Sequence, residues 1–414
     1  MRKLLCFVMA AIMFVACSKD DFGLNSQPEP QNPYAVTPEE AVQMLQSVIG
    51  GETTRSISVS DIQTLNKSAF VPSTRSGADE EAIYIVDIEG KGSAIMSADK
   101  RMEPIYAILD DTKISAEQLV GVTTRSATDD ESNPEDYILG LLNSAIQRDI
   151  EEVGLMAPEM PLVPRDKVWS VTTIRARQEP MLKTVWHQQS PYNDNYPVDN
   201  LNRKYPAGCG PIALAQILYY NRFPNSINDI TFDWDLLEEC EKENYPPSNS
   251  AKIEVANFVR QIVLNIDDVN YTELEDGRLA TGITTSNARR FLRDIGYANT
   301  SVENYSLISV MNMVVNNRPV YTSGRDSNSY GHAWVIDGCN VYQVEHWVRR
   351  YLDAQRYYDF IEHTSSYNLV HCNFGWGDCS CNGDYTSEIF NPNHGGVQYD
   401  YDLDLKLITY SSIY

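Results

Sequence analysis

The sequence predicts an α+β protein built from two successive units, and three observations lead to this prediction. Residues 37–154 show helical and strand-like patterns in the order helix, small antiparallel sheet, helix. Residues 155–168 contain three prolines and read as an extended linker between units. Residues 169–414 carry further helical and strand-like segments, with the Trp, Tyr and Gly content of a larger domain that has its own core.

The first unit opens with a clearly marked helix. Thr37 is a favoured N-cap residue, Pro38 suits the first helical position, and Glu40 stands three residues after the cap. The apolar face continues to Ile49, after which Gly50 and Gly51 end the helix. Further predicted elements are strands at Ala82–Ile88, Ser93–Met96 and Pro104–Leu109, and a helix from Asn133 to Gly154. The unit contains neither Cys nor His, so we expect no catalytic role for it.

The second unit mixes helices and strands. Helical patterns occur at Ile212–Tyr220, Lys252–Leu264, Thr285–Ile295 and, as an added amphipathic helix, His346–Ile361. Strand patterns occur at Pro319–Thr322, Ala333–Asp337, Asn368–Asn373, Tyr385–Phe390 and Asp402–Tyr410. The helix at Ile212–Tyr220 is apolar on almost all faces, which predicts a buried central helix.

The composition excludes some classes of partner. The chain has 414 residues, 43% of them hydrophobic, which is typical of globular proteins. Its formal net charge of −24 argues against nucleic acid or anionic lipid as the main partner, because both require patches of Lys and Arg.

The first 17 residues predict export. Arg2 and Lys3 precede an apolar run from Leu4 to Ala16 that is too short for a stable membrane span. Phe14-Val15-Ala16-Cys17 resembles a bacterial lipobox, so we expect lipid on Cys17 and removal of the residues before it. An ordinary signal peptide is the alternative. Residues 18–36 read as a flexible spacer. Within it, Ser18-Lys19-Asp20-Asp21 is similar to the short acidic signals that send some lipoproteins to the cell surface. We therefore expect an outer-membrane lipoprotein, with possible release of the mature domain.

The remaining cysteines leave the disulfide pattern open. Besides Cys209, five follow Cys17: Cys240, Cys339, Cys372, Cys379 and Cys381. Because five is odd, at most two disulfides form among them. The spacing of His371, Cys372, Cys379 and Cys381 matches no paired zinc pattern, so we expect no metal.

Cys209 is a candidate nucleophile. It lies just ahead of the buried helix, in Gly208-Cys209-Gly210-Pro211, where the helix dipole favours a negative charge and lowers a thiol pKa. The flanking glycines leave room for a substrate backbone. A small buried structural Cys is the alternative reading.

His332 is the candidate base. It stands between Gly331 and the hydrophobic strand Ala333–Asp337, so a sheet would hold it while its ring points into a cleft. Asn373 ends a later strand, and Trp376 follows in a glycine-bracketed turn suited to a cleft wall. A base of this kind raises the thiolate fraction, and attack by the thiolate forms an acyl-enzyme.

The oxyanion of that reaction needs hydrogen-bond donors other than the base. The Cys209 N–H is one, and an upstream side-chain amide, Gln188 or Gln189, is the candidate for the second. His187 competes as the base, but it lies beside the proposed donor and lacks a flanking glycine.

These motifs together resemble the streptopain family of secreted papain-like cysteine peptidases. The matching segments are Gln188 with Ser190–Asn193, Gly208-Cys209 with Ala213, Ala215–Ile217 and Tyr219–Asn221, Gly331-His332-Ala333 with Val335–Gly338, and Asn373 with Gly375-Trp376-Gly377. Ala94–Asp99 and Pro104-Ile105 of the first unit are similar to that family's inhibitory pro-domain.

The resemblance implies a papain-like, two-lobed peptidase domain preceded by a small α+β pro-domain that keeps the catalytic His displaced. It implies endopeptidase activity on proteins, with a preference for a hydrophobic residue two places before the scissile bond. By motif match, Cys209 is the nucleophile, His332 the base and acid, and Gln188 the oxyanion donor. Trp376 shields the Cys–His pair, and Asn373 stands in a supporting position beside it.

Two features depart from the family pattern. Gly210-Pro211 after the Cys is closer to the start of bacteriocin-leader peptidases. Residues 339–370 form a long addition where family members turn quickly, which leaves substrate preference open.

The sequence thus predicts an exported cysteine endopeptidase zymogen that needs no cofactor. Its expected partners are protein or peptide substrates, its own pro-domain as an intramolecular inhibitor, and the membrane through the lipid anchor alone. The alternatives are another papain-type thiol hydrolase, such as an amidase or leader peptidase, and a catalytically idle surface protein that keeps the fold.

Overall fold

The computed structural model describes most of the chain after the N-terminal spacer. The described residues are 34–49, 57–71, 80–121, 134–155, 166–241, 246–274, 277–325, 331–353, 355–377, 381–390 and 403–413. Residues 34–414 form one compact unit. The predicted signal segment and Cys17 lie outside the described residues, as does Cys379.

One antiparallel sheet of eleven strands organises the described part of the chain. Its order is β1-β2-β3-β4-β15-β14-β13-β12-β16-β11, with β5 paired to β13. The strands are β1 (Val59–Asn66), β2 (Glu81–Ile88), β3 (Ser93–Ser97), β4 (Ile105–Leu109), β5 (Lys167–Gln178), β11 (Ser301–Asn304), β12 (Val320–Arg325), β13 (Gly331–Tyr351), β14 (Tyr357–Asn373), β15 (Gly383–Thr386) and β16 (Leu403–Thr409). β1–β4, from the first unit of the sequence, therefore continue the sheet of the second unit.

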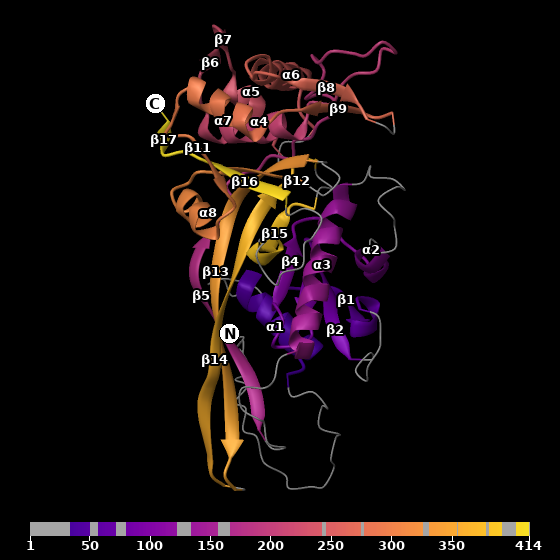
Figure 1. Cartoon of the computed structure of the whole chain (residues 1–414), viewed down its shortest axis with the longest axis vertical. Coiled ribbons are helices and arrows are strands. Elements are labelled where there is room, and N and C mark those ends of the chain that lie inside the picture. Colours follow the sequence, from indigo (N-terminus) through magenta and orange to yellow (C-terminus); the bar gives the residue numbers. More distant parts are fainter. Residues whose placement is uncertain are drawn as a thin grey trace, which may run out of the picture. The chain divides into compact units, whose positions relative to one another are not determined.

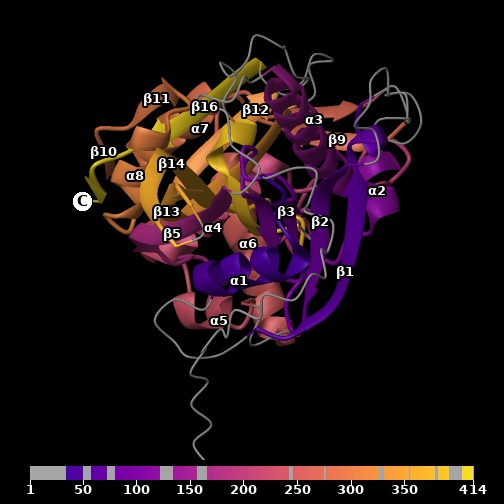
Figure 2. The same cartoon turned by 90° about the horizontal axis from the view of Figure 1, so that it is seen from below.

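The helices pack on this sheet and on one another. They are α1 (Pro38–Ile49), α2 (Ala116–Gly121), α3 (Pro134–Leu155), α4 (Cys209–Asn221), α5 (Trp234–Glu238), α6 (Asn249–Leu264), α7 (Thr285–Asp294) and α8 (Leu307–Val314). α1 contacts β2 and β5, and α3 contacts β4 (Figures 1 and 2). α4 contacts β12, β13, α6 and α7. Small two-stranded sheets complete the described fold: β6 (Ser226–Ile227) with β7 (Ile230–Thr231), β8 (Asn270–Glu273) with β9 (Leu279–Gly282), and β10 (Tyr297–Ala298) with β17 (Ser412–Ile413).

The prediction of a buried central helix is confirmed. Every residue of α4 from Gly210 to Tyr219 is buried. No face of the helix is polar, so its burial removes a large apolar area from water and fixes it inside the core.

The prediction of a helix at His346–Ile361 is wrong. These residues belong to a long hairpin of β13 and β14, which Figure 1 shows with β5 alongside. Tyr342, Val344, His346 and Val348 are buried in strict alternation, which is the period of a strand. At the turn, the Asp353 carboxylate accepts hydrogen bonds from the backbone N–H groups of Gln355 and Arg356. The tertiary cover that β5 provides outweighs the local helical pattern.

The other expected elements differ mainly at their ends. The predicted strand Tyr385–Phe390 is β15 only as far as Thr386, and Ser387–Phe390 is a short 3₁₀-helix. The predicted linker ends earlier than expected, because β5 begins at Lys167.

A second apolar cluster joins the two sequence units. It contains Tyr84, Val86, Met96 and Ile108 of the first unit together with Tyr342, Val344, Tyr367 and Leu369 of the hairpin, all of them buried. β4 also pairs with β15 through Ala107↔Tyr385, Ile108↔Asp384 and Leu109↔Gly383. The first unit is therefore bound both by backbone hydrogen bonds and by apolar burial.

Candidate active site

Cys209 stands at the start of α4, where two glycines allow close packing. Gly208, the N-cap residue, has a φ of 88°, a conformation that favours glycine. A Cβ there would lie 2.5 Å from the Thr281 carbonyl oxygen. A Cβ on Gly210 would lie 2.5 Å from Ile283 Cγ1. Both glycines are thus required by the packing around Cys209.

The Cys209 thiol is only partly exposed, and it lies against the first residues of β13. The backbone N–H groups of Ala333, Gly210 and Cys209 itself lie near the sulfur and favour its thiolate form. Burial nevertheless raises the pKa of the Cys209 thiol and outweighs these three donors. The prediction of a lowered Cys209 pKa is therefore wrong for the chain with its first unit in place. The cost of burying the thiolate exceeds the stabilisation that the N-terminus of α4 gives it.

His332 directly precedes Ala333, whose N–H reaches the Cys209 sulfur, so α4 and β13 bring the two candidate residues into one place. The His332 Nε2 lies 3.2 Å from the Phe374 carbonyl oxygen. Because a carbonyl only accepts, Nε2 carries the proton and Nδ1 is the basic nitrogen of the neutral ring. Burial lowers the pKa of His332 to about 4, partly opposed by the Phe374 carbonyl.

Aromatic rings cover His332. Trp376 is stacked on it with ring centroids 4.5 Å apart, and Phe374 is stacked on Trp376 at 5.0 Å. The Trp334 ring is also stacked with His332, at 6.1 Å. The imidazole is therefore held flat against an apolar wall formed by these rings.

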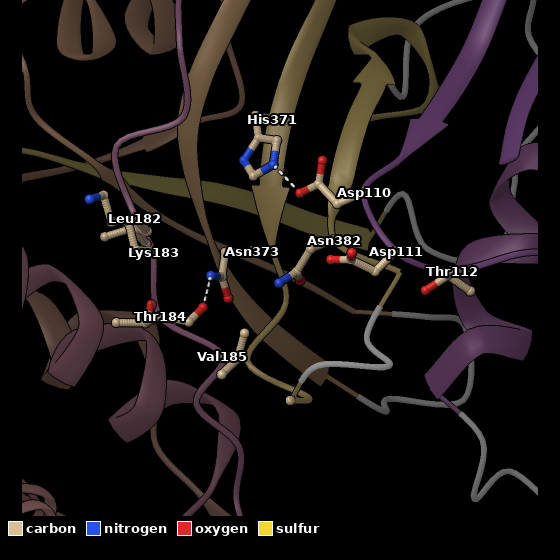
Figure 3. Close-up of a pocket in the computed structure, with 11 residues that line it drawn as sticks. Asp110, Asp111, Thr112, Leu182, Lys183, Thr184, Val185, His371, Asn373 and Asn382 are labelled. Atoms are coloured by element: carbon tan, nitrogen blue, oxygen red, sulfur yellow. Dashed lines mark hydrogen bonds and ion pairs between the residues drawn. The ribbon is translucent and has the colours of Figure 1, made fainter. Parts of the chain in front are cut away.

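Asn373 lies next to the site but its amide bonds to backbone groups. Nδ2 donates to the Thr184 carbonyl at 2.9 Å (Figure 3). Oδ1 accepts from the Gly375 N–H at 3.2 Å. In the described structure the acceptor at His332 Nε2 is the Phe374 carbonyl, not an asparagine side chain. Sequence reasoning missed this carbonyl, since every residue carries one and none stands out in a sequence.

The segment that carries Gln188 runs beside Cys209. The Gln188 carbonyl accepts from the Ala207 N–H at 2.7 Å, two residues before Cys209. Gln188 is partly exposed and Gln189 is exposed. The alternative base, His187, accepts the Gln189 N–H at Nδ1, 3.2 Å away, and packs edge-on against Tyr192. That nitrogen is thus engaged with its own loop.

A buried histidine links the two sequence units close to Asn373. His371 Nδ1 lies 2.6 Å from Asp337 Oδ1, and Nε2 lies 3.0 Å from Asp110 Oδ2 of the first unit. Burial opposes a charge on His371, but Asp337 and Asp110 together raise its pKa well above the usual value. His371, Asp110, Asn373 and Asn382 are among the residues that line a cavity of about 80 Å³ (Figure 3). The imidazolium therefore bridges two carboxylates across the junction.

The described cysteines form no disulfide with one another. Cys209, Cys240, Cys339 and Cys372 are free thiols. Among the residues placed by the structure, no three metal-ligating side chains gather into a possible metal site. None of the helices in the described ranges is long and apolar enough to cross a membrane.

Comparisons with known proteins give one matching family and several similar solved structures. The model of the peptidase C10 family matches residues 186–385. A search of curated protein sequences found no match. Among solved structures, a mutant fragment of prointerpain A from Prevotella intermedia shares 17% sequence identity with a TM-score of 0.52, over 84% of this chain and 98% of that fragment. Active wild-type interpain A cysteine protease from the same organism shares 21% identity with a TM-score of 0.41, over 57% of this chain and 95% of that one.

The fold of the first of these structures is therefore the fold of this chain, which is α+β and papain-like. The matched residues 186–385 contain Gln188, Cys209, His332, Phe374 and Trp376. Residues 186–385 thus match the peptidase C10, or streptopain, family, and this match supports a cysteine peptidase.

Proposed function

We propose that the chain is a cysteine endopeptidase made as a zymogen, in which Cys209 is the nucleophile and His332 the general base and acid. The observation that carries the proposal is the junction of α4 with β13. The Ala333 N–H lies close enough to the Cys209 sulfur to favour its thiolate, and the adjacent His332 is fixed through Nε2 by the Phe374 carbonyl. Nδ1 is then the nitrogen that takes the thiol proton.

The reaction follows from these groups. The Cys209 sulfur attacks the peptide carbonyl while its proton passes to His332 Nδ1. The resulting oxyanion accepts hydrogen bonds from the Cys209 N–H and the Gln188 side-chain amide. Collapse expels the amine, which takes the proton from His332, and leaves an acyl-enzyme. A water molecule, deprotonated by His332, then hydrolyses the thioester and restores Cys209.

In the precursor both groups are held neutral. Burial raises the thiol pKa of Cys209 and lowers the pKa of His332 to about 4, so the thiolate–imidazolium pair is disfavoured. The first unit of the sequence, residues 37–154, acts as the inhibitory pro-domain. Support for this role comes from its continuous sheet with the peptidase and from the Asp110–His371 ion pair.

The test is hydrolysis of denatured casein by the matured protein. We expect turnover by the wild type, none by Cys209→Ala, and turnover close to wild type for Cys240→Ala, which removes a buried thiol that has no part in the proposed reaction. Folding of all three is checked by circular dichroism. A Cys209→Ala protein that still cleaves casein would overturn the assignment. Wild type that reacts at Cys209 with an epoxysuccinyl inhibitor but leaves proteins and peptides intact would favour an amidase.

We also propose that the chain is exported and lipid-anchored through Cys17, facing the outside of the outer membrane. The lipobox-like Phe14–Cys17 and the acidic residues after it support this proposal. A lipid chain adds about 0.8 kcal/mol per buried CH₂, so several chains on Cys17 would anchor the protein stably. Incorporation of a labelled fatty acid by wild type and its absence in Cys17→Ser are expected, and equal labelling would reject the anchor.

A further inference from the structure

The acceptor of the His332 Nε2 proton is the backbone carbonyl of Phe374. The direction of a backbone carbonyl depends on the hydrogen bonds that fix the peptide groups around it. The Phe374 carbonyl belongs to the peptide group between Phe374 and Gly375, where Gly375 has a φ of 70°. The N–H of that same peptide group donates to Asn373 Oδ1. The N–H of this peptide group is therefore held by Asn373, and its carbonyl oxygen points at His332.

The preceding peptide group is fixed by a residue that the sequence did not single out. The Phe374 N–H donates to Asn382 Oδ1 at 2.9 Å. Asn382 comes directly before β15 and lines the cavity beside Asn373 and His371. With both flanking peptide groups bonded to asparagine side chains, the Phe374 carbonyl has little freedom to rotate away from His332.

We propose that Asn382 is a positioning residue for His332, acting through the backbone of Phe374. This inference rests on the proposed role of His332 as the general base. Asn382 contacts neither sulfur nor substrate in this scheme. Its side-chain oxygen keeps the Phe374 carbonyl aimed at Nε2, so that Nδ1 faces the nucleophile.

Residues of the proposed pro-domain also bind the backbone of Cys381 and Asn382. The Asp110 N–H donates to the Asn382 carbonyl at 2.9 Å, and the Thr112 hydroxyl accepts from the Cys381 N–H at 3.1 Å. A Cβ on Gly383 would lie 2.3 Å from the Ile108 carbonyl oxygen, so the pro-domain also packs directly on this loop. When the pro-domain leaves, these contacts are lost. The Asn382 side chain then holds the Phe374 N–H without this outside support.

The carbonyl also has an electrostatic effect that can be measured. It opposes the burial of His332 by favouring a proton on the ring. If the carbonyl turns away, the imidazolium is less stable and its pKa falls. Activity that depends on a thiolate–imidazolium pair is lost when the imidazolium deprotonates, so the alkaline limb of the pH profile moves to lower pH.

The experiment compares matured wild type with Asn382→Ala, Asn382→Asp and Asn340→Ala. Asn340 is a buried asparagine of β13 outside the catalytic arrangement and serves as the matched control. Active sites are counted with an epoxysuccinyl inhibitor, and kcat and KM are measured on a fluorogenic peptide. For Asn382→Ala we expect kcat per active site to fall about tenfold, the loss of one hydrogen bond, with KM little changed. We also expect its alkaline limb to shift to lower pH.

Asn382→Asp keeps an acceptor oxygen and is expected to restore kcat and the position of the alkaline limb. If Asn382→Ala matches Asn340→Ala in kcat and pH profile, the proposal is wrong. A fall in the number of active sites with unchanged kcat per site also overturns it, because it shows a purely structural role. Wild type that cleaves no peptide would instead reject the proposed function. In that case the rate at which iodoacetamide alkylates Cys209 is measured against pH in wild type and Asn382→Ala, and an unchanged pH dependence would overturn the proposal.

Discussion

Gly208 illustrates how single residues set the position of Cys209. Its φ is 88°, and a Cβ on it would lie 2.5 Å from the Thr281 carbonyl oxygen, so there is no room for a side chain. Thr281 is itself fixed, because its hydroxyl donates to the Pro206 carbonyl at 2.6 Å. Gly208 thus packs directly against the backbone of Thr281, which its own hydrogen bond to Pro206 holds in place.

We therefore expect Gly208→Ala to lower the free energy of unfolding by about 1–3 kcal/mol, the cost of a strained backbone conformation. Urea unfolding of the precursor measures the change. Gly154→Ala is the control: Gly154 lies in α3 with open space around it, so alanine there is expected to be neutral or stabilising by about 0.5–1 kcal/mol. Equal stability of Gly208→Ala and wild type would contradict this account of the N-cap.

At the scale of elements, β14 connects the active site to the pro-domain. His371, near the end of β14, bridges Asp337 of β13 and Asp110, which directly follows β4. Asn373, the last residue of β14, bonds to the backbone of Thr184 and Gly375. The end of β14 therefore contacts the core at Asp337, the first unit at Asp110 and the turn at Gly375 beside His332. The ion pair is the part of this arrangement that responds to pH.

Asp110→Asn is expected to destabilise the precursor by about 1 kcal/mol near neutral pH, a modest value because the Asp110 side chain is 38% exposed. The folded-state pKa of His371 is raised, so its contribution is fully present below the unfolded value of about 6.5 and is lost as the pH rises through the raised value. The difference between Asp110→Asn and wild type should then shrink in alkaline buffer.

Urea unfolding at neutral and alkaline pH measures this difference. Asp61→Asn makes the same charge change at an exposed position of β1 and should show no such dependence. A difference between Asp110→Asn and wild type that stays constant with pH would argue against the ion pair.

At the scale of the whole molecule, the proposed pro-domain and the peptidase domain share one sheet and one apolar cluster. Tyr342, Val344, Tyr367 and Leu369 of the hairpin are buried in the cluster that the first unit completes. Burying the apolar side chains of Val344 and Leu369 contributes about 1.5–3 kcal/mol each. Breaking the chain between the units therefore does not remove the forces that hold them together.

We expect a Cys209→Ala precursor, cut once between residues 155 and 167 by an added protease, to remain a single species. The two fragments should elute together in gel filtration at neutral pH and separate only in urea, since the apolar cluster and the β4–β15 pairing remain intact. Uncut precursor gives the reference elution volume. Separation of the fragments in native buffer would show that the junction is weaker than its burial indicates.

Local patterns were enough for several of these elements. The capping residues of α1, the apolar run of α4 and the strands β2–β4 follow from neighbouring residues alone, as do the motifs around Cys209 and His332. The hairpin at His346–Ile361 was misread, because aromatic and β-branched residues with charges between them fit a helix as well as a strand until β5 covers them. Phe374 and Asn382 were missed, because their roles depend on backbone groups brought together by the fold.

The sequence by itself determined the residue types on which the proposed chemistry rests, the buried helix behind Cys209 and the match to the family, since these depend on side chains and short spacings along the chain. Only the tertiary structure decided the protonation of Cys209 and His332, because burial sets their pKa values and burial is a property of the packed molecule. It alone also decided that a carbonyl orients the imidazole and that Asp110 meets His371 across 261 positions of the chain. Hydrogen bonds and ion pairs require proximity in space, and for residues so far apart proximity arises only from the fold.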